Sequence, residues 1–160
     1  MSTIADFAQV LEASPLGVWA RGSSVAYPGA NLLHLLGLIL LIGGIGIVDL
    51  RLAGAWRSIP LEAFSRALTP LAVAGLVLLG ASGLVLFAAD AGPLIGSKVF
   101  LTKLVLIGVA LANAFVFRAI WRGRLPTWDA APPLAGRSMA IVSVGLWLLV
   151  AALGRMIAYT

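Results

Sequence analysis

The chain has 160 residues, of which 61% are hydrophobic and 11% are charged, and its mean hydropathy is +1.07. A soluble domain of this length could not hide so much apolar surface from water, so the composition excludes a soluble globular protein and predicts an integral membrane protein. Lys and Arg outnumber Asp and Glu by eleven to six, but they are dispersed as in membrane topology signals, which argues against nucleic-acid binding. The absence of cysteine excludes disulfides and thiolate chemistry.

The N-terminal segment predicts a helix that lies on the membrane surface. Its apolar residues Phe7 and Leu11 recur at helical spacing, whereas Asp6 falls on another part of the helical wheel. We therefore divide the chain into an interfacial N-terminal segment, residues 1–28, and a transmembrane domain, residues 29–160.

Four apolar stretches follow, each of about the 20 residues needed to cross a bilayer. They cover residues 31–50, 68–89, 99–120 and 139–159. Proline residues between them predict three loops, at residues 51–66, 90–98 and 118–137. The predicted fold is all-α: a polytopic four-transmembrane-helix bundle preceded by an interfacial amphipathic helix, with the lipid bilayer as its partner.

The distribution of positive charge predicts the orientation. One side of the four-span arrangement carries seven arginines: Arg51, Arg57, Arg66, Arg118, Arg122, Arg124 and Arg137. The other side carries four positive residues: Arg21, Lys98, Lys103 and Arg155. Because the excess normally stays in the cytoplasm, we expect a bacterial inner-membrane protein with both termini in the periplasm.

His34, the single histidine, is the clearest candidate for chemistry. It lies about one turn inside the first predicted span, where an imidazole needs a partner or a purpose. Gly37 follows on the same helix face, so we expect a flat ligand such as haem to approach the backbone beside the imidazole. The alternative is an ordinary hydrogen bond from His34 to a neighbouring helix or to interfacial water.

Two cations and one thioether are predicted at the depth of His34. Lys103, near the start of the third span, and Arg155, near the end of the fourth, would suit the propionates of a haem whose iron His34 holds. The alternative is that both side chains snorkel to the interface. Met156 is a candidate second axial ligand of haem b. Together with His34 it could instead bind copper. A metal site without Met156 would have His34 as its single ligand or be shared across an oligomer.

Several motifs extend along the chain: Tyr27-Pro28, His34-Leu-Leu-Gly37, Asp49-Leu-Arg51-Leu-Ala-Gly54, Phe100-Leu-Thr-Lys103 and Gly154-Arg155. Together they resemble an uncharacterised bacterial family of four-span membrane proteins. That family is similar in size and hydropathy pattern to the copper-resistance protein D group and, more loosely, to the membrane-bound protoporphyrinogen oxidases, both of which use a histidine early in a span. The resemblance implies that His34, Lys103 and Arg155 occupy motif positions.

Two functions remain open at this level. The first is a protein that binds a haem-like cofactor or a metal near the periplasmic leaflet, for electron transfer or cofactor handling. The second is a non-catalytic membrane anchor or an accessory subunit of a larger membrane complex. The protein could also form a homo-oligomer. Small residues such as Gly80 and Gly108, which allow close helix approach, would serve the second function.

Overall fold

The computed structural model describes residues 3–159, with side chains from residue 5 onward, and this part of the chain is helical without strands. The α-helices are α1 (Thr3–Glu12), α2 (Pro15–Gly22), α3 (Ala26–Leu41), α4 (Ile47–Ala53), α5 (Leu61–Ala89), α6 (Ala91–Gly96), α7 (Lys98–Trp121) and α8 (Leu134–Met156). A π-helical turn (Ile42–Gly46) joins α3 to α4, and 3₁₀ turns follow α7 (Arg122–Thr127) and α8 (Ile157–Tyr159).

Four helical stretches are long and apolar enough to cross a membrane: Ala26–Ala53, Leu61–Ala89, Lys98–Thr127 and Leu134–Tyr159. The predicted all-helical, four-span fold is therefore confirmed. Each stretch exceeds the apolar run that predicted it, because charged and amphipathic residues can continue a helix beyond the hydrocarbon into the headgroup layer. The loops that connect the spans are correspondingly shorter than predicted, and the second predicted loop, residues 90–98, contains α6.

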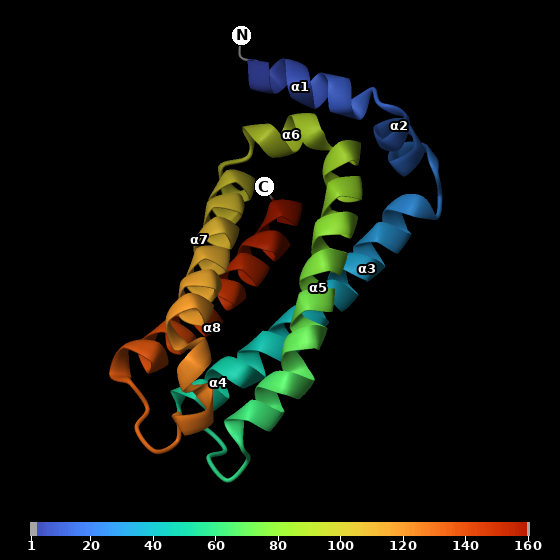
Figure 1. Ribbon diagram of the computed structural model, residues 1–160. Helices are drawn as coiled ribbons and strands as arrows, with labels where there is room; N and C mark the ends of the chain where they lie inside the picture. The colour runs from blue at the N-terminus through green and yellow to red at the C-terminus, as the bar shows by residue number, and fades with distance from the viewer. Residues whose placement is uncertain (1–2, 160) are drawn as a thin grey trace.

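The four spans form two antiparallel pairs, α3 with α5 and α7 with α8 (Figure 1). The two pairs are joined by α4, which continues the first span and packs against α8. The first pair is held close by two glycines: a Cβ on Gly75 would lie 2.7 Å from the carbonyl oxygen of Gly37. Midway along the spans, Leu41, Ala72 and Trp147 bring both pairs into one core. Small residues thus set the spacing within the first pair, and large side chains fill the space between the pairs.

The N-terminal helices lie across one end of the bundle, which also carries both ends of the described chain (Figure 1). Two side chains fasten them there. Arg21 donates a hydrogen bond to the carbonyl oxygen of Ala89, at the C-terminus of α5, over 2.7 Å. Glu12 accepts one from the backbone N–H of Gly92, in the first turn of α6, over 2.6 Å. Both bonds satisfy backbone groups that helix ends leave unpaired.

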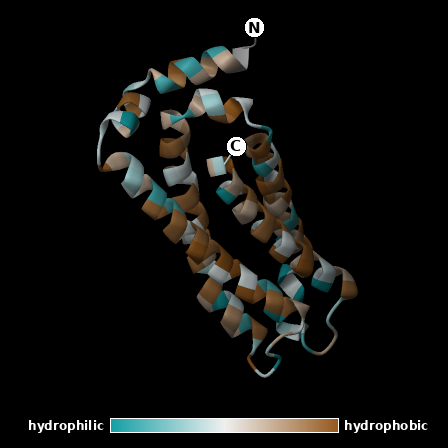
Figure 2. Ribbon diagram, turned by 180° about the vertical axis from the view of Figure 1, so that it is seen from behind, coloured by the Kyte–Doolittle hydropathy of each residue, from teal (hydrophilic) through white to brown (hydrophobic). Residues whose placement is uncertain are grey.

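We call the end with α1, α2 and α6 the terminal end, and the end with the α4–α5 and α7–α8 connections the loop end. Hydrophobic residues dominate the long helices between the two ends, and hydrophilic residues gather towards them (Figure 2). The α3 helix begins at Ala26, so Pro28 and Gly29 lie within its first turn. Proline fits there because the first N–H groups of a helix have no partner within the helix.

Candidate functional site

His34 projects from α3 towards α5, in the half of the bundle nearest the terminal end. Its Nδ1 lies 3.0 Å from the hydroxyl oxygen of Ser82, and the imidazole is partly buried. Gly83, the next residue of α5, leaves room for the ring: a Cβ there would lie 3.2 Å from Cε1 of His34. The serine and the glycine of α5 thus fix the position of the imidazole.

The partners of Ser82 determine which nitrogen of His34 carries the proton. The serine hydroxyl has one hydrogen, which it donates to the carbonyl oxygen of Leu78, four residues earlier in α5; the two oxygens lie 2.6 Å apart. Its oxygen therefore accepts a hydrogen bond from Nδ1–H of His34. In the neutral imidazole, Nε2 then keeps an unprotonated lone pair, which is the form that binds a metal.

The space beyond Gly37 is not open to a ligand. A Cβ at this position would lie 2.9 Å from the carbonyl oxygen of Gly75 and 3.0 Å from the backbone nitrogen of Leu79, so α5 already occupies this face. The prediction that a flat ligand reaches the backbone at Gly37 is wrong. The glycine serves the packing of α3 on α5, which an isolated helix cannot reveal.

Lys103 reaches from α7 to α8 at the terminal end. A Cβ on Gly154 would lie 3.2 Å from its Nζ, and the side chain is partly buried. Near the last turn of α8, the ammonium faces the negative end of a helix dipole. His34 packs against α5 and Lys103 against α8, and the prediction that the two form one site stays a prediction.

Arg155 and Met156 lie at the exposed end of α8. The Arg155 guanidinium donates a hydrogen bond to the Tyr159 hydroxyl over 2.5 Å, and its Cζ lies 5.0 Å from the centre of that ring. Met156 is 49% exposed. Within residues 3–159, neither side chain contacts His34, and the contact that the structure assembles around the imidazole is the one with Ser82.

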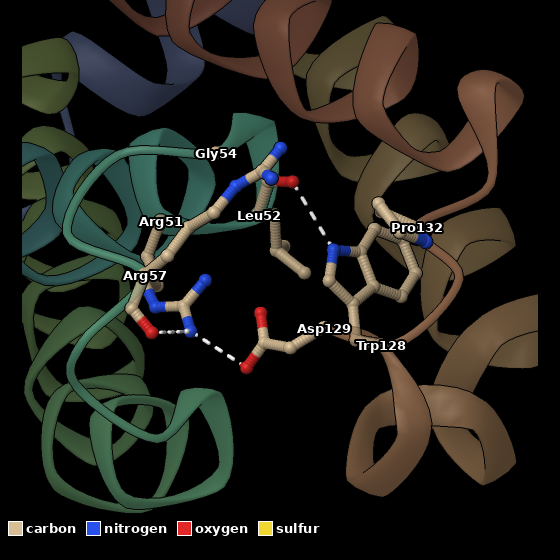
Figure 3. Close-up of a pocket in the computed structure, with 7 residues that line it drawn as sticks. All are labelled: Arg51, Leu52, Gly54, Arg57, Trp128, Asp129 and Pro132. Carbon is tan, nitrogen blue, oxygen red and sulfur yellow. Dashed lines mark hydrogen bonds and ion pairs between the residues drawn. The ribbon is translucent and has the colours of Figure 1, made fainter.

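A second polar cluster occupies the loop end and was not expected from the sequence. Arg51 is 1% exposed and donates a hydrogen bond to the carbonyl oxygen of Ile59 over 2.8 Å. It also donates one to Oδ2 of Asp129 over 2.7 Å (Figure 3). The indole N–H of Trp128 donates to the carbonyl oxygen of Leu52 over 3.1 Å. The space among these side chains is too small to admit water, so we interpret the cluster as a structural junction.

The junction completes the C-terminus of α4. Gly54, with φ of +120°, ends the helix in a backbone conformation that favours glycine. Arg137 of α8 then donates two hydrogen bonds, of 3.0 and 2.7 Å, to the carbonyl oxygen of Ala53. In the sequence, Arg51 and Arg137 served only to predict the orientation of the protein in the membrane. The residue that could have indicated the junction was Asp129, because it is an acidic residue in a loop otherwise rich in arginine.

A third polar group lies inside the first span. Asp49 is 5% exposed, its Oδ2 has no hydrogen-bond partner among the described residues, and the Ser143 hydroxyl of α8 faces it. Nearby on α8, the buried indole N–H of Trp147 also lacks a partner. An acidic residue within a predicted span was the signal for this position, because buried carboxyl groups are costly in a membrane.

His34 does not belong to a larger set of ligands. Within residues 3–159, no group of three or more His, Asp or Glu residues comes together in a way that could hold a metal ion. The candidate site is therefore one imidazole in contact with a serine hydroxyl. Comparison of the chain with known protein families, curated proteins and solved structures finds no match.

Proposed function

We propose that this protein is a multi-pass membrane protein that binds a haem-like cofactor through Nε2 of His34, for electron transfer or cofactor handling. The observation that carries the proposal is the 3.0 Å contact between Nδ1 of His34 and the hydroxyl oxygen of Ser82, whose hydrogen is directed to Leu78. From it we infer that Nδ1 carries the proton and that Nε2 is the nitrogen able to bind a metal. Histidine ligands commonly donate their other ring N–H in this way, which fixes the tautomer and the ring orientation.

The donor set fits haem better than a bare metal ion. A haem ring supplies four nitrogen ligands to its iron, so one axial imidazole is enough to hold it. A copper ion would need further protein ligands, and within residues 3–159 no group of three or more His, Asp or Glu residues could hold a metal ion. When bound, a haem would supply one-electron chemistry. His34 would hold it, and Ser82 would keep the imidazole in its ligating form.

Lys103 supports the same proposal through its charge. No hydrogen bond or ion pair of its ammonium is recorded within the described part of the chain, although the side chain is partly buried among helices. A cation in this setting is costly, and the last turn of α8 compensates it with only a fraction of a unit charge. A carboxylate of the cofactor would compensate it, and we assign that contact to Lys103. Arg155, bonded to Tyr159, is a candidate only if it changes partner.

An accessory subunit is the second candidate, and one observation favours it. Gly80 in α5, Gly108 in α7 and Gly145 in α8 have no atom of the protein within 4 Å of the position that a Cβ would occupy. Uncovered glycines within spans are sites where another transmembrane helix can approach closely. A homo-oligomer or a larger membrane complex would use these faces.

Absorption spectroscopy separates the two candidates. The protein, purified in mild detergent, is titrated with haemin, and spectra are recorded before and after reduction. We expect a Soret band that shifts on reduction, with saturation at one haem per chain. His34→Gln should abolish the band, whereas Asn31→Gln, one turn earlier at an exposed position, should leave it unchanged.

Two outcomes would contradict the haem proposal. One is the absence of saturable binding to a protein that is folded by circular dichroism and size-exclusion chromatography. The other is binding that is equal in the wild type and His34→Gln. Co-purification of a defined membrane partner with colourless protein would then favour the accessory role.

A further inference from the structure

An open groove of about 610 Å³ lies on one face of α7 at the loop end, lined by Phe115, Arg118, Ala119, Arg122 and Gly123. These residues recur at three- and four-residue intervals, so they form one continuous face of the helix. Ala119 and Gly123 carry almost no side chain and leave the hollow between the longer ones. The volume lies within the range of about 300–1,000 Å³ that is typical of ligand sites.

The two arginines of this groove have no acidic partner in the structure. The ion pairs among residues 3–159 are Arg51 with Asp129 and Arg66 with Glu62, and no hydrogen bond of the Arg118 or Arg122 side chain is recorded there. The two residues are one helical turn apart, a spacing at which like charges repel each other. An anion between them would relieve this repulsion and could accept hydrogen bonds from both guanidinium groups.

The position of the groove indicates the kind of anion. Phe115 lies in the third span and is 81% exposed, whereas Arg122 begins the 3₁₀ turn that follows α7. Trp121, which does not line the groove, packs against Trp128 with ring centres 6.0 Å apart, so the groove lies on a different face of α7 from this core contact. The groove therefore has an apolar end at Phe115, within the span, and a basic end at Arg118 and Arg122, near the edge of the hydrocarbon layer.

We propose that this groove binds an anionic phospholipid, with an acyl chain against Phe115 and Ala119 and the phosphate between Arg118 and Arg122. A lipid satisfies both parts of the groove at once, because its chain covers the apolar end and its headgroup neutralises the basic end. A zwitterionic lipid would bind less tightly, because its own positive group would meet the same arginines.

Native mass spectrometry of the full chain tests this proposal, with phosphatidylglycerol and phosphatidylcholine of identical acyl chains as probes. We expect tighter binding of phosphatidylglycerol, and a loss of about tenfold or more in its affinity for Arg118→Gln/Arg122→Gln. The control Arg57→Gln/Arg66→Gln removes two positive charges from the same end and should change the affinity less than about twofold; a tenfold change corresponds to about 1.4 kcal/mol.

Three results would overturn the proposal. An equal loss in both double variants would mean that the general charge of the loop end, and not the groove, attracts the lipid. Equal affinity for the two lipids would remove the role of the arginines. Displacement of phosphatidylglycerol by excess inorganic phosphate would identify free phosphate as the ligand. Thermal midpoints close to that of the wild type establish that both variants are folded.

Discussion

At the scale of single residues, the buried polar side chains of this bundle differ in whether the tertiary structure gives them hydrogen-bond partners. Arg51 is almost fully buried, yet its guanidinium meets two backbone carbonyls and Asp129. His34 is held by Ser82. By contrast, Oδ2 of Asp49 has no partner within the described residues. Buried polar groups usually have hydrogen-bond partners, so Asp49 differs from Arg51 and His34 in having one carboxyl oxygen without a partner among the described residues.

Removing the partner of Arg51 should destabilise the protein. Asp129→Ala takes away a charge-assisted hydrogen bond to a buried guanidinium, and we expect a loss of about 1.5–3 kcal/mol. Glu62→Ala is the matched control, because its ion pair with Arg66 is exposed and should contribute less than about 1 kcal/mol. Thermal unfolding in detergent, followed by circular dichroism, measures both. Equal midpoints for the two variants would show that the Arg51–Asp129 pair adds no more stability than the exposed Arg66–Glu62 pair.

Removing the partner of His34 should weaken the proposed cofactor site without unfolding the bundle. Ser82→Ala leaves Nδ1–H without the acceptor that fixes the tautomer, and changes of this kind typically reduce metal-site affinity about 10–100-fold. Haemin titration measures the effect, and Ser82→Thr, which keeps the hydroxyl, should restore much of the affinity. Unchanged affinity in Ser82→Ala would remove the role assigned to Ser82.

At the scale of helices, packing depends on where the glycines of a span lie. On α5, Gly75 faces the backbone of α3: a Cβ there would lie 2.5 Å from the nitrogen of Leu41. Gly80, on the same helix, has no neighbour within 4 Å of its Cβ position. Both are glycines in one span, but only one holds two helices together.

A pair of alanine substitutions tests this difference. Gly75→Ala should force α3 and α5 apart and cost about 1–3 kcal/mol, because the atoms that it meets belong to the backbone and cannot turn away. Gly80→Ala should leave stability unchanged or raise it slightly, since alanine favours the helix. The thermal unfolding midpoints of the two variants, measured in the same detergent, test this difference in stability. A Gly75→Ala protein as stable as Gly80→Ala would contradict the close packing of α3 on α5.

At the scale of the whole molecule, the two ends of the bundle differ in charge and in construction. The loop end carries the arginine-rich connections and is fixed by the junction between α4 and Trp128. The terminal end carries α1 and α2, fastened by Glu12 and Arg21 to the corner between α5 and α6. The excess of positive residues at the loop end favours its placement in the cytoplasm.

This orientation can be tested with a reporter fused after Thr160. We expect alkaline phosphatase at this position to be active and a green fluorescent protein fusion to be dark, because the C-terminus should face the periplasm. A fusion of each reporter within residues 54–60, the connection between α4 and α5, should give the opposite pair of results. Activity at the loop and silence at the C-terminus would place His34 and Lys103 in the cytoplasmic leaflet.

The sequence by itself determined the four spans, because apolar length and composition are properties of contiguous residues and need no knowledge of neighbours. It also indicated that His34 and Lys103 share a depth, since helix geometry relates residue number to height. Only the tertiary structure decided what each residue faces. The pairing of Arg51 with Asp129 and the closure of Gly37 by α5 join segments far apart in the chain, and such contacts depend on how the helices rotate and approach one another.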